Sequence, residues 1–563
     1  MKYFSNLSLL ILLFPVFATG ERPAIQEFTY PPERAYTHVS LGSSYSRNME
    51  TEAAIEEFKL ALKADPDSTF LNLTLADEYI KGNKAGEAIL VLQNLYAKNK
   101  SPEAGVSLAK IYLEDEKPAR ALEILESITK SSPKNSSAYF YLGNTYFRLD
   151  RLDEAVIAFM KSAENDQGNE ATYYNLGLVL SKKADLVGAE KAYLKAVELD
   201  PVYASPQYAL GLLYQYLSRY KEALERFRTV ESLTPYDARV YVRIGTTLSQ
   251  LNRNDEAVQY FKKASVLSPE DAAPYYKLSL VYRQQKNGQE ALLMINKALE
   301  LDGGNAEILQ VKGLIQLESG DTEGAILTFT ELTVKAPEEA AGYMYLSYLY
   351  NKKNAAKAAV SVLEQGVARL PINTDLKLYL GGAYLDSKDY DRAELQYRAL
   401  LALQPADSRG NYYLGVCCER KKDYDEALMR FRNAIKADPQ NADALNYLGF
   451  IYADRGENLE EAYAFLKKAC EIEPGNGAFV DSLAWALYKL GRNDEAMAKI
   501  EEAVKLLKDK GQEDSLVFEH LGDIYLKGSA KEKAKESYGL SVKSDPGNEN
   551  AKKKLKELQN PTR

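Results

Sequence analysis

Small and large apolar residues recur along the chain with a spacing of 34 residues, from Ala35 to about Asn548. In each copy a Leu-Gly-like pair is followed three residues later by an aromatic or aliphatic residue. An alanine stands nine residues further on, with another large apolar residue four after it and often a proline twelve after it. Residues 204–237 show the pattern in full: Leu210, Gly211, Tyr214, Ala223, Phe227 and Pro235. This spacing predicts two amphipathic helices in every copy, repeated as an array of helix hairpins.

The alanine of the pattern is present in all fifteen copies. The glycine position holds Gly, Ala or Ser throughout. Two antiparallel helices approach closely only where neither carries a bulky side chain, so we expect the small residue of the first helix to face the alanine of the second. The recurrent prolines are expected to end the second helix and to turn the chain into the next copy.

The two ends of the chain depart from the repeat. Residues 1–20 combine a lone Lys2, an apolar stretch from Leu7 to Phe17 and the small residues Ala18 and Gly20, which is typical of a secretory signal peptide. Residues 21–34 contain three prolines and no helical period, which predicts a linker. Residues 549–563 begin with a lysine-rich amphipathic stretch, predicted to be a helix that caps the last repeat, and end in a short tail.

The Leu-Gly…Tyr…Ala…Phe…Pro signature resembles the tetratricopeptide repeat (TPR), over residues 35–548. The resemblance implies an all-α solenoid of about fifteen helix-turn-helix repeats, coiled into a right-handed superhelix whose concave groove is lined by the first helix of each pair. The closing repeats are similar to those of exported bacterial multi-TPR scaffold proteins, which implies a role in binding other proteins.

Composition narrows the function further. The chain of 563 residues has 80 acidic and 71 basic residues, a net charge of −9, which disfavours a nucleic-acid partner. Three Cys and two His leave little material for a metal centre, and the chain has no phosphate loop, H-E-x-x-H or G-x-S-x-G motif. We therefore expect no enzyme activity and no cofactor. Of the 41 tyrosines, 18 fall at the fourth, eleventh and twenty-fourth repeat positions, where helices pack together.

The cysteines and one histidine admit structural interpretations. Cys417, Cys418 and Cys470 are read as small buried hydrophobic residues, with a Cys418–Cys470 disulfide as the alternative in an oxidising compartment. His38 stands at a helix-facing position and is predicted to lie in the core.

The groove-facing positions of the first helices predict a surface for an extended peptide or a partner helix. Aromatic and aliphatic side chains gather there, and tyrosine adds a hydrogen-bonding group to its ring. The predicted partner-binding residues are Phe140, Tyr174, Tyr208, Tyr276, Met344, Tyr348 and Tyr412. The alternative is that part of this stripe only packs between repeats.

A second predicted site lies near the carboxyl end. The only Trp and one of the two His fall together with three carboxylates, namely in the set Asp481, Trp485, Glu519, His520 and Asp523. Such an acidic pocket, backed by an aromatic ring, would suit a cationic group or a peptide amine. The alternative is polar capping of the end of the solenoid.

Together these features predict an exported, non-enzymatic scaffold, in the periplasm of a Gram-negative bacterium and in contact with the outer membrane or an envelope or secretion machine. Three alternatives remain open, and the first is a cytoplasmic adaptor whose amino terminus is not a signal peptide. The other two are functions in the envelope. One is a periplasmic subunit for exopolysaccharide export, and the other is a carbohydrate-binding groove, because tyrosine rings also stack on sugars.

Overall fold

The computed structural model describes residues 33–559, which form 31 α-helices and no strand. The predicted signal peptide, nearly all of the predicted linker and residues 560–563 lie outside the described residues. Thirty of the helices form fifteen consecutive pairs, and α31 (Glu549–Gln559) follows the last pair. The predicted all-α repeat fold is confirmed.

The first helices of the pairs are α1 (Glu33–Arg47), α3 (Thr69–Lys81), α5 (Pro102–Glu114), α7 (Ser136–Arg148), α9 (Glu170–Lys182), α11 (Ala204–Tyr216), α13 (Ala238–Gln250), α15 (Ala272–Gln284), α17 (Ala306–Glu318), α19 (Ala340–Lys352), α21 (Thr374–Asp386), α23 (Ser408–Arg420), α25 (Ala442–Arg455), α27 (Gly477–Lys489) and α29 (Ser515–Lys527).

The second helices are α2 (Thr51–Ala64), α4 (Ala85–Asn99), α6 (Pro118–Ser131), α8 (Leu152–Asn165), α10 (Leu186–Leu199), α12 (Tyr220–Leu233), α14 (Asn254–Leu267), α16 (Gly288–Leu301), α18 (Thr322–Lys335), α20 (Ala356–Arg369), α22 (Tyr390–Leu403), α24 (Tyr424–Ala437), α26 (Leu459–Ile472), α28 (Asn493–Asp509) and α30 (Lys531–Ser544).

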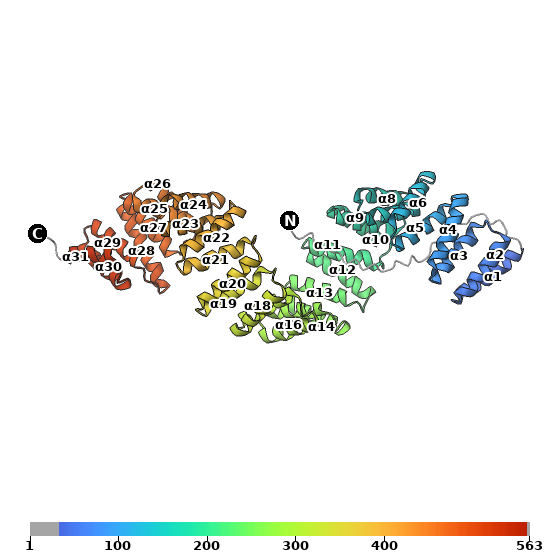
Figure 1. The fold of residues 1–563 in the computed structure, drawn as a ribbon, viewed down its shortest axis with the longest axis horizontal. Helices are drawn as coiled ribbons and strands as arrows, with labels where there is room; N and C mark the ends of the chain where they lie inside the picture. Colours follow the sequence, from blue (N-terminus) through green and yellow to red (C-terminus); the bar gives the residue numbers. More distant parts are fainter. Residues whose placement is uncertain (1–32, 560–563) are drawn as a thin grey trace. The chain divides into compact units, whose positions relative to one another are not determined.

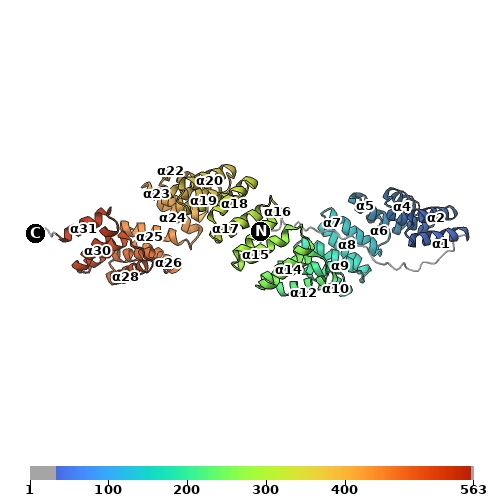
Figure 2. The same ribbon diagram turned by 90° about the horizontal axis from the view of Figure 1, so that it is seen from below.

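The helices group into two compact units, residues 1–260 and 261–563, with the boundary inside α14. Within each unit, the helices from α1 to α13 and from α15 to α31 each pack on the next helix along the chain, as Figures 1 and 2 show. A single hairpin cannot bury its own apolar face, so each pair depends on its neighbours for a core.

The invariant alanine explains how the two helices of a pair come together. All fifteen alanines are 0% exposed, which confirms that this position is a point of close approach. A larger side chain there would have no space to occupy, because protein interiors are packed to crystal-like density.

The small residue of the first helix has a different partner from the one predicted. A β-carbon added at Gly177 would lie 2.5 Å from the ring of Tyr193, and one at Gly381 would lie 2.5 Å from the ring of Tyr397. Each ring stands four residues after the invariant alanine, so the glycine makes room for that ring rather than for the alanine. The expectation that small residues face alanine is corrected accordingly.

The same pairing explains where the chain uses Ala or Ser in place of Gly. In those five copies the opposing buried residue is Leu or Ile: Ala76 with Leu92, Ala109 with Leu125, Ser279 with Ile295, Ser347 with Leu363 and Ala484 with Ile500. In these five copies a slightly larger residue on the first helix accompanies a smaller one on the second, whereas Gly449 lies opposite Leu466. The two positions share one volume.

Many tyrosine hydroxyls connect neighbouring repeats. At the eleventh position, Tyr146 donates to Glu126 and Tyr214 donates to Glu190, each at 3.0 Å and each on the preceding second helix. At the fourth position, Tyr241 and Tyr343 donate to the carbonyls of the prolines six residues earlier. These bonds account for part of the tyrosine excess as repeat architecture.

Candidate functional site

The first helices form the inner layer of each unit. Besides contacting their own partner helices, several first helices also contact the first helix of the next repeat, as in α5 with α7, α19 with α21 and α21 with α23. Second helices show no comparable contact between neighbours in residues 33–559. Layers that lie closer together are on the concave side, so the first-helix face is the concave face of each unit.

The predicted partner-binding residues lie on this face at different depths. Tyr348 is 55% exposed. The other six are half-buried: Phe140, Tyr174, Tyr208, Tyr276, Met344 and Tyr412.

The half-buried rings pack against the repeat itself. Phe140 meets Phe159 at a ring-centroid distance of 6.0 Å, and Tyr208 meets Phe227 at 5.6 Å. Tyr174 lies 5.5 Å from Tyr203, and its burial raises the pKa of its phenol to about 12. These rings are walls of the concave face, with only their edges available to a partner.

Two of the predicted residues already use their hydroxyls. Tyr276 donates to Glu307 of the next repeat at 2.6 Å. Tyr208 accepts a longer bond of 3.4 Å from Nε of Arg243. Both bonds link successive first helices, so these residues also fix the spacing of the face.

The structure adds a row of tyrosines that the sequence analysis missed. The sixth position is tyrosine in four consecutive repeats: Tyr345 on α19, Tyr379 on α21, Tyr413 on α23 and Tyr447 on α25. Tyr413 stacks on Tyr397 of the preceding second helix, with centroids 5.6 Å apart and rings inclined by 12°. Tyr379 and Tyr413 are 50% and 36% exposed. We call these four residues the tyrosine row.

The predicted residues of the carboxyl-terminal pocket do lie together, but they bind one another and leave no open pocket between them. Nδ1 of His520 lies 2.9 and 3.1 Å from the two carboxylate oxygens of Asp481, and both side chains are buried. The indole of Trp485 stacks on the imidazole at 4.1 Å. Among the described residues, the indole nitrogen of Trp485 is buried without a hydrogen-bond partner.

The remaining two carboxylates bind the last helix. Nζ of Lys554 on α31 lies 2.8 Å from Glu519 and 2.7 Å from Asp523. Asn548 donates to Glu519 at 2.9 Å, and Tyr538 donates to Asp523 at 2.6 Å. The cation that this acidic set was predicted to receive is therefore supplied by the chain itself. We call Asp481, Trp485, Glu519, His520, Asp523 and Lys554 the terminal cluster.

Charge pairing within the terminal cluster outweighs its burial. Burial lowers the pKa of His520, but the charge of Asp481 and its hydrogen bond raise it above the usual value. Burial raises the pKa of Glu519, but Lys554 and Asn548 bring it below the usual value. Both groups are thus stabilised in their charged forms.

Comparison with known families identifies the repeat. The model described as tetratricopeptide repeat matches residues 35–68, 171–203, 238–271 and 272–305. Two further models match other segments, one for anaphase-promoting complex, cyclosome, subunit 3 (residues 81–162) and one for the cilia and flagella-associated protein 70 middle TPR-like domain (residues 379–508). The chain is a tetratricopeptide-repeat protein.

Solved TPR structures resemble this TPR chain in fold. The APC/C hetero-tetramer Cut9-Hcn1 is 16% identical, with 88% of this chain and 97% of that chain covered and a TM-score of 0.39. Yeast Tom70 is 17% identical, with 76% and 95% covered and a TM-score of 0.32. MamA is 27% identical, with 29% and 95% covered and a TM-score of 0.28. No curated protein matched the sequence.

The cysteines of the TPR array are unpaired. Cys417 and Cys418 are buried and Cys470 is partly buried, and all three are free thiols. Burial raises the pKa of Cys417 and of Cys418 to about 12, which disfavours the reactive thiolate. The structure thus places these thiols as packing residues, without the alternative disulfide.

His38 is not a core residue, contrary to the prediction. Its side chain is 34% exposed, and its Nδ1 lies 2.7 Å from Glu57 on α2. The imidazole reaches a carboxylate at the edge of the first TPR.

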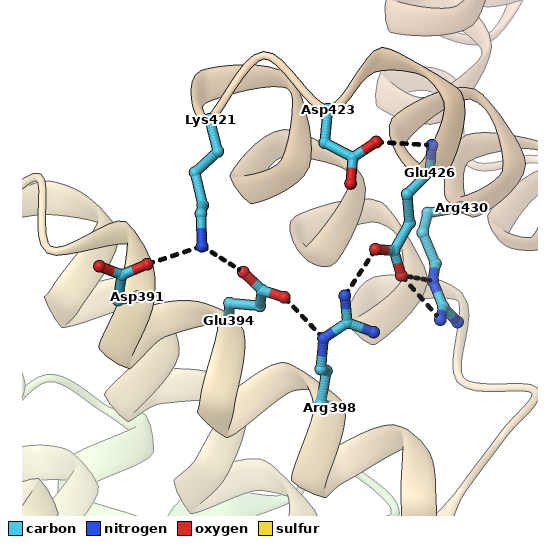
Figure 3. A network of polar contacts seen from close by, with 7 residues as sticks. All are labelled: Asp391, Glu394, Arg398, Lys421, Asp423, Glu426 and Arg430. Carbon is cyan, nitrogen blue, oxygen red and sulfur yellow. Dashed lines mark hydrogen bonds and ion pairs between the residues drawn. The ribbon is translucent and has the colours of Figure 1, made fainter.

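An ion-pair network replaces a tyrosine at the junction of the eleventh and twelfth TPRs (Figure 3). Cys418 stands at the eleventh position, which in many other repeats holds a tyrosine bonded to the preceding second helix. Lys421 pairs with Asp391 at 2.6 Å and with Glu394 at 2.8 Å, and Arg398 pairs with Glu394 and Glu426. The network therefore joins α22 to α24 where the tyrosine bond is missing.

The described residues show neither a metal site nor a membrane-spanning helix. Residues 33–559 contain no group of three or more His, Cys, Asp and Glu side chains placed to hold a metal ion. Within the same range, no helix combines the length and the apolar character needed to cross a membrane.

Proposed function

We propose that this TPR protein is a non-enzymatic scaffold that binds partner proteins on the concave face of its first helices. The observation that carries the proposal is the tyrosine row on the first helices, because Tyr379 and Tyr413 are exposed and the ring of Tyr413 is held by stacking on the buried ring of Tyr397. Rigid aromatic anchors of this kind give a large contact area at a low entropic cost.

The predicted residues of the concave face complete this surface. Tyr348 offers an exposed ring beside the tyrosine row, and Phe140, Tyr174, Tyr208, Tyr276, Met344 and Tyr412 offer ring edges and flat apolar contacts. A peptide laid along the first helices would meet one such contact in each repeat.

Export to a bacterial envelope is part of the proposal and rests on residues 1–20. Their short positive start, apolar stretch and small terminal residues favour translocation and cleavage. We place the protein in the periplasm, where it would serve an envelope-assembly, secretion or exopolysaccharide-export machine. Sequencing the amino terminus of the mature protein tests this: a terminus near residue 19 or 21 supports export, and an intact Met1 contradicts it.

Affinity capture from envelope fractions tests the binding function. The bait is the full chain, compared with the double variant Tyr348→Ala/Tyr379→Ala and with Leu395→Ala, which removes an exposed side chain from α22. The proposal predicts a defined partner that is lost with the tyrosine variant and kept with the control. Recovery of the same proteins with all three baits would refute a binding function for the concave face.

A further inference from the structure

Three of the four rings of the tyrosine row are held in the same way by the preceding second helix. Tyr345 stacks on Phe329 with ring centroids 4.8 Å apart and planes inclined by 18°, and Tyr447 stacks on Phe431 at 5.4 Å and 27°. Tyr413 stacks in the same manner. Each supporting ring is the buried aromatic residue four positions after the invariant alanine. The row is therefore a ladder that presents one aromatic ring in each repeat.

The hydroxyl groups of the tyrosine row are unused. None of the four makes a hydrogen bond within residues 33–559, and none of their oxygens is buried. By contrast, Tyr384 on the same α21 donates to Glu364. Burial and the nearby charges of Asp443 and Asp386 raise the pKa of Tyr413, so its hydroxyl stays protonated and can donate. The row thus offers one O–H donor in each repeat.

No side chain at the ninth position covers the two exposed rings of the row. Gly382 stands one turn after Tyr379 on α21, at the position that holds Tyr348 in the preceding repeat. A β-carbon added at Gly382 would have a single neighbour within 4 Å, the Tyr397 hydroxyl at 4.0 Å. Because Tyr413 stacks on Tyr397, the bare glycine lies beside both exposed rings. A flat apolar group can therefore reach them.

The spacing of the row matches one kind of extended chain. Successive first helices contact each other from α19 to α23, and packed helices lie about 8–10 Å apart. A polyproline II helix advances about 9 Å in three residues and then returns to the same side, so every third residue meets a ring. A β-strand returns to the same side only after an even number of residues, at about 7 or 13 Å. The spacing favours polyproline II.

The unused hydroxyls favour the same conformation. The carbonyls of a polyproline II segment make no hydrogen bonds within the segment, and proline has no N–H group. Such a segment therefore offers many acceptors and few donors. An α-helix uses most of its carbonyls internally and would leave the phenol O–H groups without acceptors.

Charge along the row disfavours an acidic segment. The second repeat position, one turn before each tyrosine, holds Ala341, Asp375, Arg409 and Asp443. The guanidinium of Arg409 already pairs with Asp375 at 3.1 Å and with Asp407 at 3.5 Å. An acidic segment would meet carboxylates without a free cation at this position, so a neutral or basic segment fits the row.

We propose that the tyrosine row binds a proline-rich, neutral or basic segment of the partner in the polyproline II conformation, with one tyrosine for every third residue. The proline rings that face the row pack on the tyrosine rings, and the phenol O–H groups donate to carbonyl oxygens of the segment. This inference rests on the proposed function and adds the chemistry of the partner.

The test measures binding of a fluorescein-labelled oligoproline to the full chain, by fluorescence anisotropy. About twelve residues span the row, at about 3.1 Å per residue. A Gly/Ser peptide of the same length lacks the preformed helix. The variant Tyr379→Phe/Tyr413→Phe removes two hydroxyls and keeps both rings. Its control, Tyr236→Phe/Tyr424→Phe, makes the same change at exposed tyrosines outside the first helices.

We expect saturable binding of oligoproline, which the site variant weakens by about fivefold or more and the control by less than about twofold. The Gly/Ser peptide should bind at least about tenfold more weakly. Gly382→Leu should also weaken binding, because its side chain would cover the exposed rings. Gly539→Leu, which adds the same side chain in open space on α30, should leave binding unchanged.

Four results would overturn the proposal. Equal binding of the two peptides, no saturable binding, or equal effects of the site and control variants would each exclude a row that recognises polyproline II. Binding of a neutral oligosaccharide in place of oligoproline would assign the rings to a sugar.

The natural partner separates this inference from the proposed function. A partner that is lost with Tyr348→Ala/Tyr379→Ala, but is kept with Tyr379→Phe/Tyr413→Phe and is not displaced by oligoproline, would preserve the proposed function and refute this inference.

Discussion

The terminal cluster and the tyrosine row both place aromatic side chains on first helices, but only the terminal cluster is satisfied by other residues of the chain. In the terminal cluster, His520 and Lys554 pair with all three carboxylates, and α31 closes the set. In the tyrosine row, Tyr379 and Tyr413 are 50% and 36% exposed, and the neighbouring Tyr397 hydroxyl makes no hydrogen bond among the described residues. Residue type alone does not mark a binding site, whereas exposed rings and unused hydrogen-bonding groups do.

The largest expected loss of stability is in the terminal cluster. Asp481→Ala leaves the buried imidazole of His520 without its carboxylate, which should cost about 3 kcal/mol of local stability. Hydrogen exchange of α27 and α29 measures it as a loss of protection of about a hundredfold. Unchanged protection would mean that the pair contributes nothing to closing the array.

Gly381 and Gly382 are neighbours with different surroundings, since only Gly381 packs tightly against the ring of Tyr397. Gly381→Ala drives a methyl group into the ring of Tyr397 and should destabilise the eleventh repeat by about 1–3 kcal/mol. Gly382→Ala meets no such contact and should stabilise the helix by up to about 1 kcal/mol. Urea denaturation of the two variants should give midpoints shifted in opposite directions, and shifts of the same sign would contradict the different surroundings of the two glycines.

The pairing of Gly381 with Tyr397 also offers a rescue. Adding Tyr397→Leu to Gly381→Ala recreates the Ala–Leu combination that the chain uses at Ala76 and Leu92. The double variant should recover part of the stability lost by Gly381→Ala. Additive losses would show that the two positions do not share one volume.

Within the terminal cluster, Glu519 and His520 should respond to pH with opposite signs. The pKa of Glu519 is lowered, so its stabilisation is present above pH 4.5 and is lost as pH falls through the folded-state value. The pKa of His520 is raised, so its stabilisation is present below pH 6.5 and is lost as pH rises through the folded-state value. Protection of α29 and α31 should therefore be greatest between these limits.

Asp443 should respond to pH with the sign opposite to that of Glu519. Its pKa is raised by burial, so the protonated form is favoured by folding, and the contribution to stability falls as pH rises above 3.8 through the folded-state value. Hydrogen exchange of α25 in wild type and in Asp443→Asn separates this contribution, because the variant should lack it. An identical pH profile in the two proteins would count against an unpaired carboxylate.

The smallest expected effect is at Asp386. Asp386→Asn removes a charge that no internal group pairs with, so the free energy of unfolding should change by less than about 0.5 kcal/mol. A loss comparable to that of Asp481→Ala would show that Asp386 supports the fold, and would remove the contrast between the two regions.

The fold is predictable from the sequence because small residues recur at fixed positions of the TPR, where two helices must approach closely. The alanine and glycine positions predict fifteen hairpins, and the structure has them. Residue size alone does not determine which residue of the second helix lies opposite the glycine, since a glycine leaves room for either an alanine or a ring. The ring pairing becomes visible only when Gly381 is seen against Tyr397.

The candidate site is only partly predictable. The five residues Asp481, Trp485, Glu519, His520 and Asp523 do come together, but the lysine-rich stretch 549–559 does not reveal which lysine reaches Glu519 and Asp523. The tyrosine row had a signal, tyrosine at the sixth position of four consecutive repeats, which lies one residue from the positions taken to face the groove. Exposure and unpaired charge depend on side-chain packing, which the repeat pattern does not specify.

Hydrogen exchange of the full chain, with and without the partner recovered by affinity capture, tests the contrast between the two regions most directly. The account predicts added protection in α21 and α23 and none in α27 and α29, because only the tyrosine row has exposed rings that are free to bind. Added protection in α27 and α29, or a uniform change along the chain, would contradict it.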